Sequence, residues 1–300
     1  MICQHREGVG NMVQMIATDM DGTLLNHEGK ISPENQKALR LAREKGILVV
    51  IATGRSYQGA VTVLEEAGLR LPLIHLNGAC IRSEKGMILR EISLDVNQVR
   101  KLHEAFRAAG IYHELYTSGG IYCNRDGFQN LKGELDRLQI DRSKVQDWIR
   151  DLAKKQFRTT EICDRYYEDV MEEAKSPVFK VLAFSLMEEK LAEAREKAKS
   201  VAGVCVTSSN GQNIEINHPE AQKGIAVEFF ARLHGIPMER VMVLGDQFND
   251  LSMMKRAGVS VAMGNADEEV KKACRYVTRT NDEHGVAYAI QTWAGIEAVV

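Results

Sequence analysis

The first quarter of this 300-residue chain alternates short apolar, β-branched runs with longer amphipathic segments. Strands are predicted at 13–18, 47–52 and 73–76, and helices at 33–45 and 57–67. Ser32 as N-cap and Pro33 in the first turn mark the start of the first helix. Because parallel strands need a crossover between them, this βαβαβ order predicts a parallel sheet covered by helices.

The middle of the chain has a different pattern, in which hairpins are interleaved with charged helices. Hairpins are predicted at 79–92 and 111–123, helices at 95–109, 131–156 and 188–200, and strands at 178–185, 204–207 and 213–216. The first pattern returns from Ala221, with helices at 221–233 and 267–274 and strands at 241–244 and 259–262. We therefore predict a doubly wound parallel-sheet core, 12–88 and 214–300, interrupted by an inserted α+β domain, 89–213. Residues 1–11 are expected to form a disordered leader.

Composition narrows the possible partners. The 39 lysines and arginines against 41 aspartates and glutamates leave no basic excess for a nucleic-acid backbone. No apolar stretch is long enough to cross a membrane, and the first residues lack the apolar centre of a secretory signal. We expect a cytoplasmic protein with neither nucleic-acid nor membrane partners. The six cysteines form no C-x-x-C pair, so free thiols are expected. The pattern specifies no oligomeric state.

Two acids directly follow the first predicted strand, in the segment Asp19-Met20-Asp21-Gly22-Thr23. Ligands of open α/β sheets gather outside the carboxyl ends of the strands. In an extended segment, Asp19 and Asp21 lie on the same side, so one can attack or bind metal while the other moves protons. A strand-ending turn is the alternative, because Asp and Gly are common turn residues. A calcium loop is excluded because Lys30 stands where the loop needs a glutamate.

Three other segments could complete a site. Thr53 and Gly54 precede a predicted helix, where a hydroxyl and free amides can bind phosphate, although a capped turn explains them equally well. Lys223 could supply a positive charge, although a lone lysine is usually solvated. Asp246 and Asp250 follow the strand 241–244 and add negative charge, for which hard oxygen ligands favour Mg²⁺ over zinc.

Taken together, these segments resemble the motifs of the haloacid dehalogenase superfamily. The motifs are D-x-D-G-T-L at 19–24, the hydroxyl motif at 53–55, the lysine motif at 223–224 and G-D-x-x-N-D at 245–250. A large insert between the second and third motifs is similar to the Cof-type branch of phosphatases, in which a mobile cap covers the site. The resemblance implies a phosphoric monoester hydrolase with a Rossmann-like core and an inserted α+β cap domain.

The resemblance also implies a role for each motif residue. Asp19 would be the nucleophile that forms an aspartyl-phosphate, and Asp21 the general acid and base. Mg²⁺ would be held by the Asp19 carboxylate, the Asp21 backbone carbonyl and Asp246, which requires the side chains of residues 19 and 246 to lie within about 8 Å. The phosphoryl oxygens would be bound by Met20, Thr53, Gly54, Lys223 and Asn249. Asp250 would orient Lys223 or a metal-bound water.

The expected function is Mg²⁺-dependent hydrolysis of a small phosphomonoester, such as a sugar phosphate, pyridoxal phosphate or flavin mononucleotide. A phosphomutase acting on sugar phosphates and a non-catalytic phosphometabolite sensor are the alternatives. Aromatic and basic cap residues could face the ligand, although such side chains more often pack or lie in solvent. These residues are His113, Tyr116, Tyr122, Arg125 and Arg165.

Overall fold

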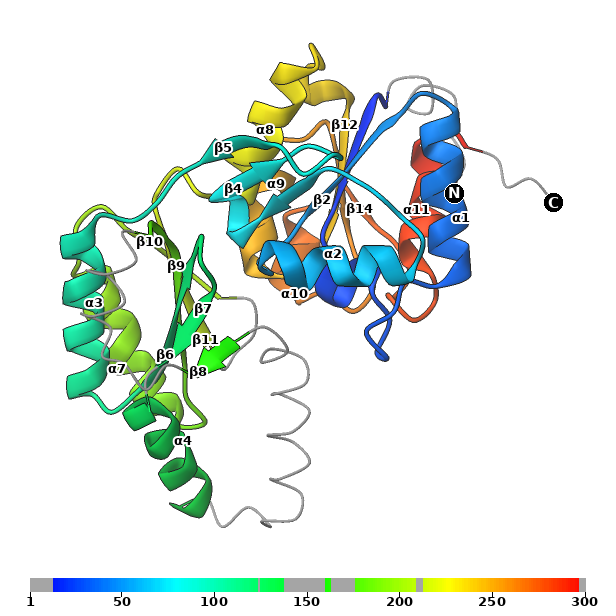
Figure 1. The fold of residues 1–300 in the computed structure, drawn as a ribbon. Coiled ribbons are helices and arrows are strands. Elements are labelled where there is room, and N and C mark those ends of the chain that lie inside the picture. Colours follow the sequence, from blue (N-terminus) through cyan, green and yellow to red (C-terminus); the bar gives the residue numbers. More distant parts are fainter. Residues whose placement is uncertain (1–12, 124, 138–159, 163–175, 209–212, 297–300) are drawn as a thin grey trace. The chain divides into compact units, whose positions relative to one another are not determined.

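The computed structural model describes residues 13–123, 125–137, 160–162, 176–208 and 213–296 (Figure 1). The chain divides into two compact units, a core unit of residues 1–90 and 220–300 and a cap unit of residues 91–219. The boundary predicted at 213/214 is wrong by six residues, because strand β11 (Asn213–Asn217) pairs with β9 (Val178–Phe184) in the cap sheet. The other boundary, predicted between residues 88 and 89, lies two residues later, between residues 90 and 91. The predicted leader, 1–11, lies outside the described residues.

The core unit contains an eight-stranded sheet of order β14-β13-β12-β1-β2-β3-β4-β5. Its strands are β1 (Met15–Thr18), β2 (Leu48–Ala52), β3 (Leu73–His75), β4 (Cys80–Arg82), β5 (Ile88–Glu91), β12 (Val241–Gly245), β13 (Val259–Ala262) and β14 (Tyr276–Val277). β1 is central and pairs in parallel with β2 and β12. All four residues of β1 are buried, as expected for a parallel strand covered on both faces.

Helices cover both faces of this sheet. They are α1 (Pro33–Glu44), α2 (Tyr57–Glu66), α8 (Lys223–Leu233), α9 (Leu251–Met254), α10 (Glu268–Lys272) and α11 (Gly285–Trp293). Figure 1 shows α1 beside α11 and α8 beside α9. The predicted doubly wound α/β core is therefore confirmed. α11 was not predicted, because its N-cap, His284, has a left-handed φ of 58° and makes no side-chain cap hydrogen bond.

The cap unit contains a six-stranded sheet of order β10-β11-β9-β6-β7-β8. Its remaining strands are β6 (Tyr112–Thr117), β7 (Ile121–Cys123), β8 (Thr160–Ile162) and β10 (Cys205–Thr207), and its helices are α3 (Val96–Ala108), α4 (Arg125–Arg137) and α7 (Glu188–Lys199). The pairing is antiparallel except between β7 and β8. The sequence analysis predicted a helix at 131–156. α4 starts six residues earlier, and the segment beyond 137 lies outside the described residues.

Two findings bear on the expectations from composition. Cys80, Cys123, Cys205 and Cys274 are free thiols. Among the described residues, no helix combines the length and apolar character needed to cross a membrane.

His75, at the end of β3, should make stability depend on pH. Burial and the nearby Arg82 charge lower the pKa of His75 to about 3, and neither ring nitrogen has a hydrogen-bond partner. An unfolded histidine titrates near 6.5, so between this pH and about 3 the unfolded chain binds a proton that folded His75 does not. The free energy of unfolding is therefore unaffected by His75 above pH 6.5 and decreases as the pH falls toward 3.

Replacing this imidazole by an apolar side chain should flatten the acid dependence. For His75→Leu, we expect the loss of unfolding free energy between pH 7.5 and 4.5 to be smaller than in the wild type by roughly 2–3 kcal/mol. Urea unfolding at both pH values measures this loss, with His234→Leu, at an exposed histidine, as the matched control. An unchanged pH dependence in His75→Leu would contradict the prediction.

Candidate active site

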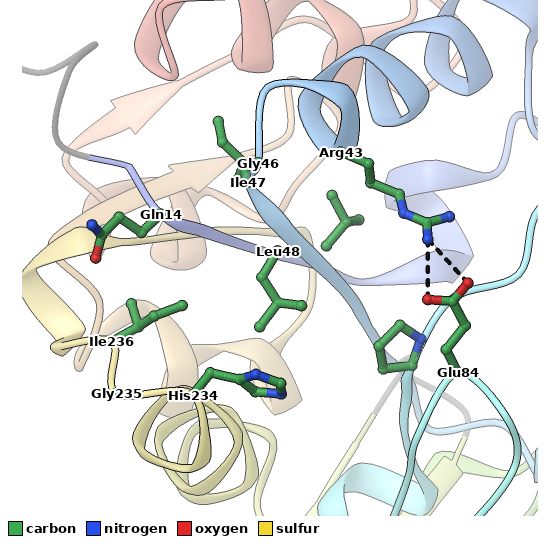
Figure 2. Close-up of a pocket in the computed structure, with 11 residues that line it drawn as sticks. Gln14, Arg43, Gly46, Ile47, Leu48, Glu84, His234, Gly235 and Ile236 are labelled. Atoms are coloured by element: carbon green, nitrogen blue, oxygen red, sulfur yellow. Dashed lines mark hydrogen bonds and ion pairs between the residues drawn. The ribbon is translucent and has the colours of Figure 1, made fainter.

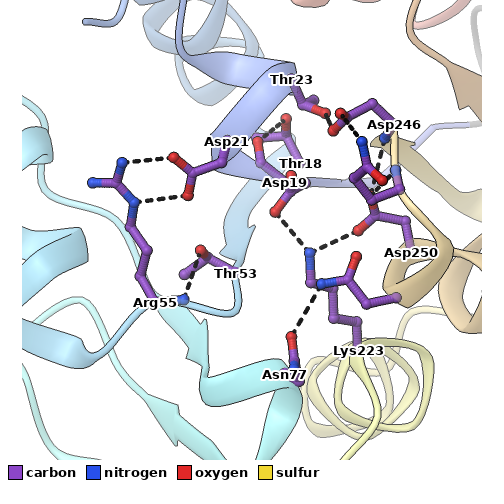
Figure 3. Close-up of polar contacts among 12 residues, drawn as sticks. Thr18, Asp19, Asp21, Thr23, Thr53, Arg55, Asn77, Lys223, Asp246 and Asp250 are labelled. Atoms are coloured by element: carbon purple, nitrogen blue, oxygen red, sulfur yellow. Dashed lines mark hydrogen bonds and ion pairs between the residues drawn. The ribbon is translucent and has the colours of Figure 1, made fainter. Parts of the chain in front are cut away.

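The predicted motif residues meet at the carboxyl edge of the core sheet (Figure 3). Asp19 follows β1, Thr53 follows β2 and Asp246 follows β12. Their positions are fixed by backbone hydrogen bonds beyond the strands, from Asp19 N to Leu244 O at 3.0 Å and from Thr53 N to Ile74 O at 2.8 Å. Lys223 is the first residue of α8. Segments about two hundred residues apart in sequence are thus in direct contact.

Lys223 forms the positive centre of the site. Its Nζ lies 2.7 Å from Asp19 Oδ1 and 2.7 Å from Asp250 Oδ1. The side chain is 1% exposed. Burial opposes its charge, but the two carboxylates outweigh burial and raise the pKa of Lys223 above its ordinary value. Asp250 contacts Lys223, one of the two arrangements considered for it, and its part in catalysis stays a prediction.

Three carboxylates surround this lysine closely enough to hold a cation. Asp19, Asp246 and Asp250 each offer one oxygen, and these oxygens lie within 4.8 Å of one another. The side chains of Asp19 and Asp246 are therefore close enough to share a metal ion, well within the limit of about 8 Å given above. Burial raises the pKa of Asp19, and burial together with Asp250 raises the pKa of Asp246 to about 7. A bound cation would offset both effects, because it stabilises the charged carboxylates.

The hydrogen bonds distinguish the three carboxylates. Asp250 accepts three hydrogen bonds, at Oδ1 from Lys223 and at Oδ2 from the amides of Asp246 and Gln247, whereas Asp246 accepts one at each oxygen, from the side chains of Thr23 and Gln247. Asp19 Oδ2, in contrast, accepts no hydrogen bond from the described part of the chain. The hard oxygen donors of Asp19 and Asp246 thus fit Mg²⁺. Asp19 and Asp246 are also the two side chains predicted to hold the metal.

The rest of the D-x-D-G-T-L segment supports Asp246. Thr23 Oγ1 donates to Asp246 Oδ1 at 2.8 Å. Gly22 has a φ of 77°, and a methyl group at this position would collide with the Asp246 carboxylate. Residue 22 must therefore be small for the two strand ends to approach each other.

Asp21 occupies a different environment from Asp19. It accepts from Arg55 Nε at 2.7 Å and from Arg55 Nη2 at 2.6 Å, a bidentate pair. The Asp21 side chain is 58% exposed and that of Asp19 is 7% exposed. Asp19 and Asp21 have different partners, Lys223 and Arg55, because the chain leaves the extended conformation in the turn Met20–Leu24 (Figure 3). That both carboxylates act on one side of a bound ligand stays a prediction. Arg55 belongs to the motif at 53–55, but no role was predicted for it.

The predicted phosphate-binding residues line the same edge. Thr53 is fully buried, and its Oγ1 accepts from the Arg55 amide at 3.1 Å, so the hydroxyl proton remains available as a donor. Met20 and Gly54 directly follow Asp19 and Thr53. Asn249 Nδ2 donates to Asn77 Oδ1 at 3.2 Å. Sequence reasoning missed Asn77, although it too follows a strand of this sheet edge.

The cap residues proposed to face a ligand are engaged in packing where they are described. His113 is buried and contacts the His103 ring nitrogen at 2.9 Å, and Tyr116 donates to the buried Glu114 at 2.8 Å. Tyr122 is half-buried. The Arg125 side chain and Arg165 lie outside the described residues.

A hollow of about 600 Å³ lies at the opposite edge of the core sheet (Figure 2). It is lined by residues that precede or begin strands, among them Gln14, Leu48, Pro72 and Ile236. Arg43 and Glu84 line one side, where Arg43 Nη2 donates to both carboxylate oxygens of Glu84 at 3.0 Å. None of the motif residues lines this hollow, which is therefore separate from the candidate active site.

The comparisons with known proteins agree with this geometry. A sequence model of the haloacid dehalogenase-like hydrolases matches residues 16–290. The chain belongs to this family. It is 33% identical to the phosphatase YwpJ of Bacillus subtilis over 93% of this chain and 99% of that protein. It is 34% identical to the 5-amino-6-(5-phospho-D-ribitylamino)uracil phosphatase YwtE of the same organism, over 93% of this chain and 97% of that protein.

A solved structure extends the likeness to the fold. A haloacid dehalogenase-like hydrolase from B. subtilis superposes with a TM-score of 0.82 at 32% identity, covering 93% of this chain and 99% of that one. This member of the haloacid dehalogenase family is thus a phosphatase of the Cof type with an inserted cap, a phosphoric monoester hydrolase.

Proposed function

We propose that this phosphatase is a cytoplasmic, Mg²⁺-dependent enzyme that hydrolyses a small phosphorylated metabolite through an aspartyl-phosphate on Asp19. The observation that carries the proposal is the position of the Asp19 carboxylate. One oxygen is held by Lys223 at 2.7 Å, while the other accepts no hydrogen bond within the described residues. A carboxylate of this kind needs no base to attack phosphorus.

The reaction divides into two transfers. In the first, an Asp19 oxygen forms a bond to phosphorus, the bond from phosphorus to the substrate oxygen breaks, and Asp21 donates a proton to the departing alkoxide. In the second, a water attacks the phosphorus of the aspartyl-phosphate while Asp21 removes its proton. Free phosphate leaves, and both carboxyl groups return to their initial states.

The surrounding groups stabilise charge on the phosphoryl oxygens. Lys223, the Thr53 hydroxyl and the Asn249 amide would donate to them, together with the backbone amides of Met20 and Gly54. Mg²⁺, held by Asp19, Asp246 and the Asp21 carbonyl, would supply a positive charge against the carboxylates and the phosphoryl group. Asp250 would hold Lys223 in place, since it contacts Nζ directly.

The substrate is proposed to be a phosphate ester of a polar metabolite. The relative named as a 5-amino-6-(5-phospho-D-ribitylamino)uracil phosphatase supports a phosphorylated polyol, and sugar phosphates and pyridoxal phosphate are further candidates. Measuring phosphate release across a panel of such esters tests this proposal. Transfer of the phosphoryl group to a second sugar hydroxyl would instead indicate a mutase, and binding without release would indicate a sensor.

Removal of divalent metal should silence the enzyme. We expect EDTA to reduce hydrolysis of p-nitrophenyl phosphate by at least about 10²-fold, because a metal ion contributes several kcal/mol to transition-state stabilisation. Added Mg²⁺ should restore the rate. Full activity after thorough chelation would contradict the proposed dependence.

A binding measurement separates metal binding from catalysis. Mg²⁺ should raise the melting temperature of the metal-free wild type, since a ligand at 100 times its Kd adds roughly 2.7 kcal/mol to stability. Asp246→Asn should weaken this response, whereas Asp282→Asn, at an exposed carboxylate paired with His27, should preserve it.

A further inference from the structure

The turn that follows β3 has an unusual backbone. Leu76, Asn77 and Gly78 have φ values of 51°, 59° and 99° in succession. Among the described residues, only one other non-glycine residue, His284, has a positive φ. Two adjacent non-glycine residues in the left-handed region are strained, and such strain persists only where the surroundings impose it.

The motif segments impose this conformation. Leu76 N donates to Arg55 O at 3.0 Å, and Asn77 N donates to Thr53 O at 3.0 Å. On the other side, a methyl group at Gly78 would lie 2.7 Å from Gln222 O, the residue before Lys223. The turn is therefore fixed between the hydroxyl motif and the start of the lysine helix.

The Asn77 side chain connects this turn to the fourth motif. Asn77 is 3% exposed, and its Oδ1 accepts the hydrogen bond from Asn249 Nδ2 at 3.2 Å (Figure 3). Asn249 Oδ1 is buried without a hydrogen-bond partner, so this bond alone orients the Asn249 amide within the described residues. Nδ2 carries two protons, and the second remains available for a ligand.

We propose that Asn77 is a positioning residue for phosphoryl transfer. By accepting one Nδ2 proton, it holds the Asn249 amide so that the other proton is directed to a phosphoryl oxygen. The strained turn fixes this acceptor to the Thr53 loop, which binds the same phosphoryl group. The inference rests on the proposed phosphate-binding role of Asn249.

Asn77→Gly tests this role without disturbing the backbone, because glycine adopts a positive φ freely but offers no side-chain acceptor. We expect kcat/KM for p-nitrophenyl phosphate to fall about tenfold, the usual effect of losing one hydrogen bond to the transition state. The inhibition constant of inorganic phosphate should rise by a similar factor. The melting temperature should not fall. His284→Gly, a glycine substitution at a left-handed position outside the site, should alter neither kinetic constant.

The double variant shows whether Asn77 acts through Asn249. If it does, Asn77→Gly should add little to the loss caused by Asn249→Ala. Losses that multiply in the double variant would overturn the inference, as would wild-type kinetics of Asn77→Gly beside an impaired Asn249→Ala. Wild-type phosphate inhibition in Asn249→Ala would instead refute the proposed role of Asn249, and the inference with it.

Discussion

Asp19→Asn is expected to lower turnover of p-nitrophenyl phosphate by about 10⁴-fold or more, the scale of losing a covalent nucleophile. The amide of asparagine is too weak a nucleophile to form the acyl-phosphate. The two side chains have nearly the same shape, and Lys223 keeps its contact with Asp250. The rate of phosphate release, measured at saturating Mg²⁺, checks the expectation.

The same variant should stay folded. Burial, Asp250 and Asp246 raise the pKa of Asp19 by more than the Lys223 charge lowers it, so the charged carboxylate costs stability in the metal-free protein. The melting temperature of metal-free Asp19→Asn should therefore equal or exceed that of the wild type. Asp282→Asn makes the same chemical change at an exposed site and serves as the control for both activity and melting temperature. Substantial activity in Asp19→Asn would refute the nucleophile assignment.

Lys223→Met should affect both activity and stability. The substitution keeps an unbranched side chain but leaves two buried carboxylates without their cation. Removing one partner of a buried ion pair costs about 3–5 kcal/mol, and we expect a loss of this size in the free energy of unfolding. Activity should fall by on the order of 10²–10³-fold, because the positive charge of Lys223 no longer stabilises the phosphoryl oxygens. Urea unfolding and steady-state kinetics measure the two effects.

The origin of the lost stability can be tested by neutralising a carboxylate. Lys223→Met/Asp250→Asn should recover part of the unfolding free energy. Acid should act similarly. Asp19, whose pKa is raised, takes up a proton in the folded protein at a pH where the unfolded chain does not. The loss of unfolding free energy in Lys223→Met relative to the wild type should therefore shrink as the pH falls from 7 toward 5. A deficit independent of both changes would show that lost packing, not unpaired charge, destabilises the variant.

The order of strands and the positions of the main motifs are encoded locally. β1 is buried on both faces and reads as an apolar run, and Ser32, as predicted, accepts from the Asn35 amide at the start of α1. From this order, the rule that ligands bind at the carboxyl ends of parallel strands places Asp19, Thr53 and Asp246 at one edge. α11 was not predicted because it lacks a side-chain cap, and β14 was not predicted because it has only two residues.

Tertiary structure alone decided how the side chains pair. The parallel core and the acids at its carboxyl edge follow from the sequence, because local hydrophobic pattern and strand direction dictate both. Local sequence does not specify that Asp21 hydrogen-bonds to Arg55, that Asn77 hydrogen-bonds to Asn249, or that β11 belongs to the cap sheet. These contacts depend on the turn at residues 20–24, the left-handed turn at residues 76–78 and strand partners distant in sequence, and no local pattern specifies which distant groups a turn brings within hydrogen-bond distance.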